Sequence, residues 1–221
     1  MTRALTLLRA TGRRLGRDTS GVALLEFALT APVLLLMSLA GAELTNYITT
    51  RMRVSQIALH LADNAARIGS GSQLQAKTIS EADINDLLLG ADMQSGELGL
   101  LTNGRVIISA LEPMANPNPT GKFKITWQRC KGSKTTHASA YGTYNQPTGT
   151  AMTGMGPSGR QATAPLGGQT MFVEVYYVYR PLVKTSLSPT TEMTEVASMM
   201  VRDRRDLSQI YNNPAVTKSL C

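Results

Sequence analysis

The residue of most chemical interest is Glu26, the one charged side chain in the apolar stretch 22–42. A charge near the middle of a membrane helix costs about 2.5–3.5 kcal/mol on insertion scales. Gly21 lies five positions before this carboxylate, and Phe27 follows it directly. The simplest interpretation is that Glu26 faces a neighbouring helix or snorkels to the membrane surface. A disposable secretory signal would have no need of it.

Residues that could catalyse a reaction are sparse. The sequence contains no G-x-S-x-G elbow, no G-x-x-x-x-G-K-[ST] phosphate loop, no H-E-x-x-H motif and no C-x-x-C pair. Its two histidines, His60 and His137, are expected on a helix surface and in a loop. Asp83, Asp86 and Asp92 cluster in a predicted helix, where acidic residues more often complement the helix dipole than bind metal. We therefore expect no enzymatic activity, no metal and no cofactor.

Basic residues are concentrated at the start of the chain. The 221 residues carry a formal net charge of +7, and residues 1–21 hold five arginines against one aspartate. By the positive-inside rule, this leader places the N-terminus in the cytoplasm and everything after residue 42 on the other side of the membrane. Topology thus explains the basic cluster, and we exclude nucleic-acid binding.

The apolar stretch 22–42 is long enough to cross a bilayer. A spanning helix needs about 20 apolar residues, whereas a secretory signal needs only about 7–15 before a small-residue cleavage site. Segments 38–40 and 40–42 would each serve as such a site. Removal as an ordinary signal peptide therefore stays open.

A single long helix is expected to continue beyond the membrane. Apolar residues recur at helical spacing on one face, namely Leu44, Tyr47, Val54, Ala58, Leu61, Ala65 and Ile68. A helix over 22–68 would be about 70 Å long. The Gly-Ser run 69–72 is expected to end it.

The remainder of the chain predicts a small antiparallel sheet. Strands are expected at 105–111, 122–130, 171–179 and about 195–201, after a short helix over 81–89. Ser80 and Asp83 would cap that helix, and Gly90 would close it. In the second strand, Phe123, Ile125 and Trp127 alternate onto one face, so we expect that face to be buried. The predicted fold class is α+β, with the long helix packed on the sheet.

Segment 131–169 has the composition of a loop, with eight glycines and no acidic residue. Loops of this length are usually functional or disordered, and we expect a flexible loop here. The alternative is a surface that holds an anionic partner, because the segment carries basic and aromatic side chains, namely Lys131, Lys134, Tyr141, Tyr144 and Arg160.

The residues around Glu26 also resemble a known family. Gly21, Glu26 and Phe27 form a G-x-x-x-x-E-F pattern that, after a basic leader, resembles the processing site of type IV pilin-like proteins. The run GVALLEFALTAP over 21–32 resembles more specifically the TadE-like family of tight-adherence (Tad, or Flp) pilus proteins. In that family a G-x-x-x-x-E-F-A-L motif and a following proline, here Pro32, open the membrane helix. The resemblance is strong over 13–47 and weaker around Cys130 and over 172–205.

This resemblance implies both a processing step and a role in assembly. A prepilin-type aspartic peptidase would cut between Gly21 and Val22, which leaves Glu26 as the fifth residue of the mature chain. Its carboxylate would then meet the free amino group of a neighbouring subunit, which offsets the desolvation of both charges. The partners implied are the inner membrane, the peptidase, other pilin-like subunits and the pilus assembly machinery.

The two cysteines, Cys130 and Cys221, lie 91 positions apart, and both fall outside the membrane on the predicted topology. In an oxidising periplasm a disulfide between them is expected. Closing so long a loop would stabilise the fold by about 4–5 kcal/mol. Residues 206–220 would have to fold back across the edge of the sheet. The alternative is two unrelated thiols.

We therefore predict a membrane-anchored minor pilin or pseudopilin that supports assembly of a bacterial tight-adherence pilus, and thus surface attachment and biofilm formation. Residues 1–21 would be a cleaved cytoplasmic leader, 22–42 a transmembrane helix, 43–68 its amphipathic continuation and 69–221 a periplasmic α+β domain. The protein would reside in the inner membrane and could enter the pilus after processing. Two alternatives stay open: an unprocessed single-pass envelope protein whose periplasmic domain binds a partner, and a type II secretion pseudopilin.

Overall fold

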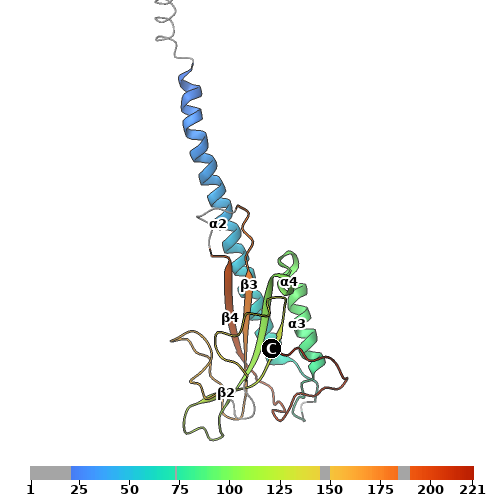
Figure 1. Cartoon of the computed structure of the whole chain (residues 1–221). Coiled ribbons are helices and arrows are strands. Elements are labelled where there is room, and N and C mark those ends of the chain that lie inside the picture. Colours follow the sequence, from blue (N-terminus) through green and yellow to red (C-terminus); the bar gives the residue numbers. More distant parts are fainter. Residues whose placement is uncertain (1–20, 73, 145–149, 184–189) are drawn as a thin grey trace, which may run out of the picture.

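A computed structural model describes residues 21–72, 74–144, 150–183 and 190–221 (Figure 1). The predicted leader, up to residue 20, lies outside these ranges, as does part of the predicted flexible loop, residues 145–149. The elements follow in the order α2 (Val22–Arg67), α3 (Glu81–Ser95), η1 (Gly96–Leu98), α4 (Leu100–Asn103), β1 (Gly104–Pro113), β2 (Phe123–Lys131), β3 (Thr170–Val178) and β4 (Glu192–Met200).

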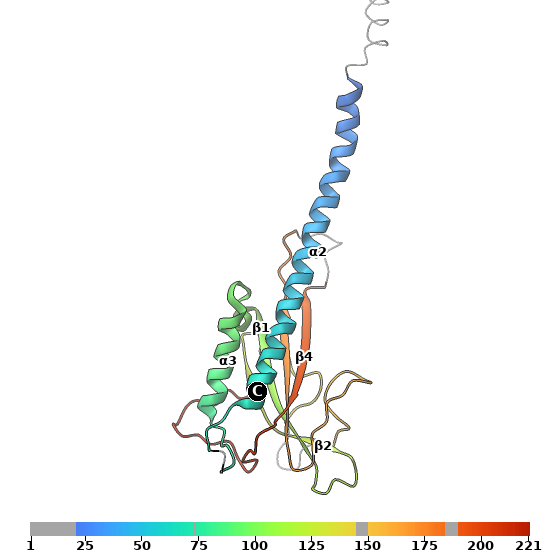
Figure 2. The same cartoon turned by 180° about the vertical axis from the view of Figure 1, so that it is seen from behind.

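Helix α2 dominates the shape of the molecule. Its 46 residues form one unbroken helix through Pro32, about 69 Å long at 1.5 Å per residue. The first half projects alone from the domain, and the second half packs on it (Figures 1 and 2). The predicted long helix is therefore confirmed.

The end of α2 is fixed by backbone geometry and by one arginine. Gly69 adopts a φ of +119°, and a Cβ there would lie 2.8 Å from the carbonyl oxygen of Thr78, so a side chain is excluded. Arg205 donates to the carbonyl oxygens of Ala65 (3.2 Å) and Ile68 (2.8 Å). Burial lowers the pKa of Arg205 to about 10. One carbonyl in the last turn of α2 and that of its C-cap residue are thus satisfied by a residue far along the chain.

The second half of α2 buries one face against the sheet. Its buried residues are Glu43, Thr50, Val54, Ile57, Ala58, Leu61, Ala62, Ala65 and Ala66. These include most of the apolar face predicted from the sequence, and Tyr47 and Ile68 pack at its margin. The prediction is wrong for Leu44, which is 54% exposed and so does not lie on the buried face.

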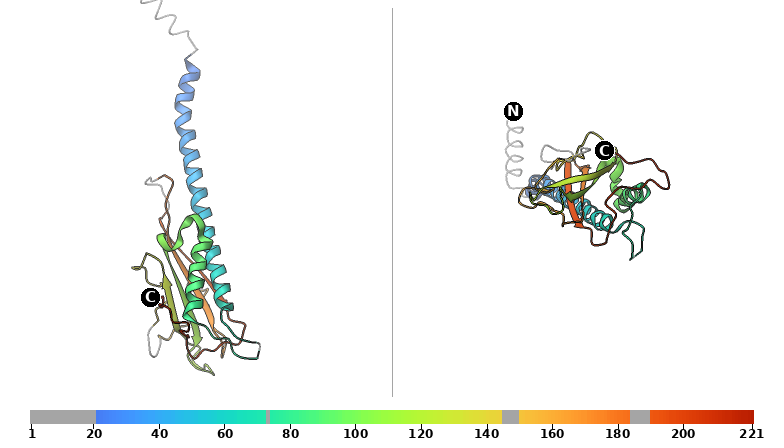
Figure 3. Two further views of the ribbon diagram at one scale, coloured as in Figure 1. Left: turned by 90° about the vertical axis from the view of Figure 1, so that its right-hand side faces the viewer. Right: turned by 90° about the horizontal axis from the view of Figure 1, so that it is seen from below.

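The sheet has four antiparallel strands in the order β2-β1-β3-β4. The four predicted strands are present, with ends displaced by one to three residues. Helix α2 packs on β3 and β4, and α3 runs beside its second half (Figure 3). The predicted α+β class, a long apolar helix on an antiparallel sheet in a pilin-like arrangement, is confirmed.

Helix α3 begins as predicted and ends later. Ser80 and Asp83 form a complete capping box, which satisfies the first free amides of the helix. The predicted end at Gly90 is wrong, because the helix continues to Ser95 and Gly96 caps it. Leu88 and Ala91, on either side of Gly90, are buried against the core, and this packing outweighs the modest cost of a glycine within a helix.

A β-bulge in β2 overturns the expectation that Phe123, Ile125 and Trp127 share one face. Ala110 pairs with Trp127 whereas its neighbour Leu111 pairs with Ile125, so the register shifts at Thr126. An extra residue of this kind reverses the side-chain alternation beyond it. Trp127 therefore packs in the core on the helix side, and Phe123 and Ile125 belong to a second core on the opposite face.

The second core is covered by the described part of segment 131–169. Met155 is fully buried, and Tyr141 packs edge-on against Phe172 with ring centroids 5.5 Å apart. After Lys131, the last residue of β2, the described residues of the segment form no named helix or strand, as its composition predicts. The expectation of a single buried face is nevertheless wrong, because segment 131–169 covers the outer side of the sheet. Flexibility of this segment stays a prediction.

Polar groups attach this outer segment to β3. Glu174 is buried and accepts from the Ser139 hydroxyl at 2.8 Å, and it lies 3.1 Å from the Nε2 of His137. The His137 ring stacks on Tyr176 with centroids 3.9 Å apart. His137 therefore lies in a loop, as expected, and its side chain links that loop to β3.

The C-terminal tail returns to β2 and forms the predicted disulfide. Cys130 and Cys221 are bonded, with Cα atoms 4.9 Å apart. The amide of Cys130 donates to the carbonyl oxygen of Ser219 at 2.9 Å, so the tail lies along the free edge of β2. Before it reaches β2, the tail forms an isolated parallel β-bridge between Tyr211 and Ser80.

Removing this disulfide should destabilise the fold. A Cys130→Ser/Cys221→Ser variant of the full chain in detergent should lose about 4 kcal/mol of unfolding free energy, because a long loop of the unfolded chain is no longer closed. Denaturant unfolding followed by circular dichroism measures the loss. Reduced wild-type protein should match the double variant. Thiol labelling of both cysteines in the unreduced native protein would contradict the disulfide.

Candidate functional site

The most distinctive surface of the protein is the bare apolar half of α2. Eleven large apolar side chains between residues 22 and 39 are each at least 49% exposed, namely Val22, Leu24, Leu25, Phe27, Leu29, Val33, Leu34, Leu35, Leu36, Met37 and Leu39. Among the described residues, α2 is the one helix long and apolar enough to cross a membrane, and none of its apolar window is buried in the protein. A signal sequence shares these properties, so the surface indicates a membrane anchor or a signal.

The predicted cleavage site lies at the open end of this helix. Gly21 is exposed, and its carbonyl oxygen accepts from the amide of Leu25 at 3.1 Å. Among the described residues, no side chain caps the helix here, and a Cβ added to Gly21 would meet no atom within 4 Å. The part of the chain that the structure describes therefore places no packed side chain against the Gly21 side of this bond.

Glu26 lies one helical turn after Val22. Residues four apart lie on the same side of a helix. The Glu26 carboxylate is exposed and has no ion pair or hydrogen bond with any residue in the described ranges. Thr30 donates to the Glu26 carbonyl oxygen at 2.9 Å, which leaves the carboxylate available to a partner. Phe27 and Pro32 are also exposed.

A buried carboxylate marks the border between the bare and packed halves of α2. Glu43 is 7% exposed and accepts three hydrogen bonds: from the Tyr179 hydroxyl (2.8 Å) and from the amides of Leu182 (2.8 Å) and Val183 (3.1 Å). Desolvation by burial raises the pKa of Glu43, and the three hydrogen bonds lower it. Together the hydrogen bonds have the larger effect, so the pKa lies below the ordinary glutamate value. Burial, together with the bond to Glu43, raises the pKa of Tyr179 to about 12.

A family model described as "TadE-like protein" matches residues 21–70. Residues 21–70 are a TadE-like domain. The match begins at Gly21 and covers all of α2. It implies a protein related to Tad pilus assembly, with an apolar N-terminal helix. Searches of curated proteins and of solved structures give no significant match.

The TadE-like domain ends before α3 and the sheet. The weaker resemblance expected around Cys130 and over 172–205 is not part of the match. The comparisons therefore support the motif and the helix, and the architecture of the outer domain comes from the structure alone.

Sequence reasoning missed Glu43 as a structural residue. A usable signal existed, since Glu43, Tyr47, Thr50 and Val54 follow one another at spacings of four, three and four on the buried face of the helix. The sequence alone does not identify the groups that satisfy this carboxylate, because they come from residues about 136–140 positions later.

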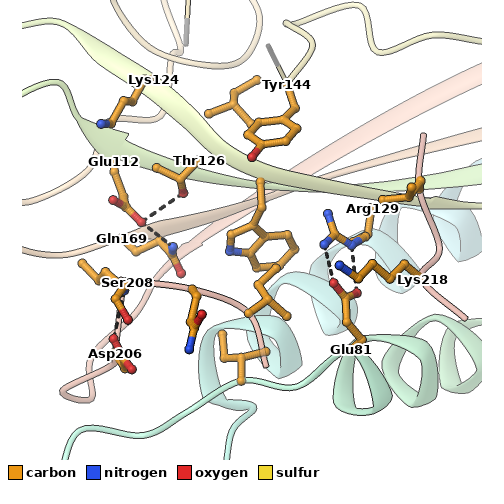
Figure 4. A pocket seen from close by; sticks show the side chains of 17 residues that line it. Glu81, Glu112, Lys124, Thr126, Arg129, Tyr144, Gln169, Asp206, Ser208 and Lys218 are labelled. Atoms are coloured by element: carbon orange, nitrogen blue, oxygen red, sulfur yellow. Dashed lines mark hydrogen bonds and ion pairs between the residues drawn. The ribbon is translucent and has the colours of Figure 1, made fainter. Parts of the chain in front are cut away.

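A cavity of about 560 Å³ lies between β2 and the C-terminal tail (Figure 4). Its acidic side chains already have partners. Glu81 forms an ion pair with Arg129, and Asp206 accepts from the amide of Ser208 (2.9 Å). Glu112 accepts from Thr126 (3.0 Å) and Gln169 (2.7 Å), and burial raises the pKa of its carboxyl.

Catalytic or metal chemistry finds no support in these groups. Within the described ranges, no three His, Cys, Asp or Glu side chains gather as a metal site requires. The hydrogen bonds in the cavity join protein groups to one another, so they act as structural links from β2 to α3 and to β1, and within the tail.

The Glu43 network makes a prediction about pH. A carboxylate with a lowered pKa stabilises the fold above its unfolded pKa, and this contribution is lost as the pH falls through the folded value. Glu43→Gln should therefore lower the melting temperature of the full chain at pH 7, and the gap from wild type should close as the pH falls below about 4.5.

Thermal unfolding in detergent at pH 7, 5 and 3 measures this effect. Glu97→Gln, at an exposed acidic residue outside the network, is the control and should leave the melting temperature nearly unchanged. A constant gap for Glu43→Gln from pH 7 to pH 3 would contradict the assignment.

Proposed function

We propose that this protein is a membrane-anchored minor pilin or pseudopilin that supports assembly of a bacterial tight-adherence pilus. The observation that carries the proposal is the bare apolar half of α2, which begins with a G-x-x-x-x-E-F motif inside a TadE-like domain. An exposed apolar surface of this size requires lipid or other apolar helices around it. Pilus assembly supplies both in succession.

In this proposal, residues 1–21 form a cytoplasmic leader and residues 22–42 cross the inner membrane. The domain after residue 42 lies in the periplasm, where the disulfide between Cys130 and Cys221 is favoured. A prepilin-type aspartic peptidase removes the leader between Gly21 and Val22. The surroundings of Gly21 support such access, since no side chain of residues 21–72 or of the rest of the described domain packs against it.

The new amino group of Val22 gives Glu26 a partner. A carboxylate in an apolar helix bundle is costly unless it is paired, and Glu26 has no partner within the described part of its own chain. A neighbouring subunit would bring its amino terminus to this carboxylate and so set the axial register between helices. The protein then acts by assembly with other pilin-like subunits and the pilus machinery, and we assign it no catalytic step.

Processing can be tested by the N-terminal residue of the protein isolated from its own membrane. Intact-mass analysis should give a chain that begins at Val22. Gly21→Leu should block cleavage and leave membrane insertion intact. Gly41→Leu is the matched control, because a Cβ at either glycine would meet no atom within 4 Å, and it should be processed normally.

Two other results would contradict the processing step. A chain beginning at Met1 or Thr2 would identify an unprocessed anchor. A chain beginning near Gly41 or Glu43 would identify a conventional signal peptide.

The role of Glu26 can be tested separately from processing. Glu26→Gln should leave the protein inserted and stable, because the carboxylate forms no hydrogen bond or ion pair with any described residue. The variant should reduce pilus number and surface attachment at least tenfold, because an unpaired amino group in an apolar bundle costs several kcal/mol. Glu97→Gln, which removes an exposed carboxylate from the outer domain, is the control. Wild-type piliation by the Glu26→Gln protein would show that the carboxylate has no role between subunits.

A further inference from the structure

Described residues on either side of 184–189, in the connection between β3 and β4, lie beside α2 at the end of the folded domain that faces Val22 (Figures 1 and 2). Two side chains of α2 fix its described part. Glu43 accepts from the amides of Leu182 and Val183, at 2.8 and 3.1 Å, and Asn46 donates to the Tyr179 hydroxyl at 2.8 Å. Residues 179–183, the membrane-proximal loop, are therefore held at the level of residue 43.

That level coincides with the edge of the apolar segment. Residues 22–42 rise about 31 Å along the helix, which matches the hydrocarbon thickness of about 30 Å. The polar headgroup layers add about 5–7 Å on each side of that core. If 22–42 spans the bilayer, Glu43 and the amides bonded to it lie at the headgroup layer on the domain side.

The exposed side chains of this loop suit a headgroup layer. Leu182 is 66% exposed. Arg180 is exposed and forms no ion pair with any described residue. A cation beside an apolar side chain is the combination that binds lipid phosphates and the adjoining acyl region together. Other exposed leucines, such as Leu166 and Leu74, lie near the opposite ends of β3 and α2.

We propose that residues 180–182 form a second membrane contact, in which Leu182 enters the headgroup layer and Arg180 pairs with a lipid phosphate. This inference rests on the proposed placement of residues 22–42 in the membrane. Since the loop is bonded to α2 on one side and continues into β3 on the other, the contact sets how the domain is oriented over the bilayer. The same loop covers the Glu43 carboxylate, which is 7% exposed, at the point where the apolar segment ends.

Depth-dependent quenching tests this contact on the full chain. The protein is reconstituted into phosphatidylethanolamine/phosphatidylglycerol vesicles with and without lipid brominated in the upper acyl chain. Trp127 is the single natural tryptophan and supplies a constant background from the core. Leu182→Trp should add emission that bromine reduces about twofold, as expected for an indole at the interface.

Leu166→Trp is the matched control, since Leu166 is 62% exposed and precedes the far end of β3. The nine residues of that strand separate it from the loop by about 30 Å. Its added emission should be insensitive to bromine. Arg180→Glu in the Leu182→Trp background should restore most of the quenched emission, and undiminished quenching would refute the phosphate contact.

The remaining outcomes separate this inference from the proposed function. If the chain floats with the vesicles and the emission added by Leu182→Trp is not quenched, the loop stands clear of the bilayer and the inference is wrong. If that emission changes with protein density and not with bromine, the loop contacts a second copy, which also overturns it. If the chain does not float with the vesicles at all, the membrane placement itself fails.

Discussion

The contact between the second half of α2 and strands β3 and β4 fixes the arrangement of the other elements. It buries a face in which Ala58, Ala62 and Ala65 have no exposure, so the helix backbone approaches the sheet closely, and α3 then packs beside it to complete the core on that side. Because α2 is continuous, the same contact sets the direction in which its bare half leaves the domain. The assembly surface is thus oriented by packing that lies entirely outside it.

Buried carboxylates connect the elements around this contact. Glu43 binds the β3–β4 loop to α2, Glu81 binds α3 to β2 through Arg129, and Glu174 binds the outer segment to β3. Burying a charge is costly unless hydrogen bonds compensate it, and removing one partner leaves the other unsatisfied. Each of these carboxylates therefore specifies one arrangement of two elements, whereas apolar contacts alone would tolerate a shift.

Much of the fold follows from local patterns in the sequence. The long helix, the Ser80 capping box and the four strands depend on spacing and composition within short windows, and the motif at Gly21 and Glu26 is local as well. The failures have longer-range causes. The bulge at Thr126, which depends on pairing with β1, changes the side of the sheet on which the β2 side chains lie. Helix α3 continues beyond Gly90 because Leu88 and Ala91 are buried in the core. The partners of Glu43 and Glu174 come from segments far apart in sequence, which periodicity does not reveal.

The disulfide also has a mechanical consequence for a subunit held by its N-terminal helix. Cys130 and Cys221 enclose the last residue of β2, the outer segment, β3 and β4 in one covalent loop with a sequence separation of 91. Under tension, a chain of that length would extend by about 300 Å at 3.3–3.6 Å per residue. Because the disulfide joins the two ends of this segment, the segment cannot lengthen the chain under tension. If α2 were pulled from the sheet, only the segment from the end of α2 to Cys130 could unravel, and the closed remainder would stay attached.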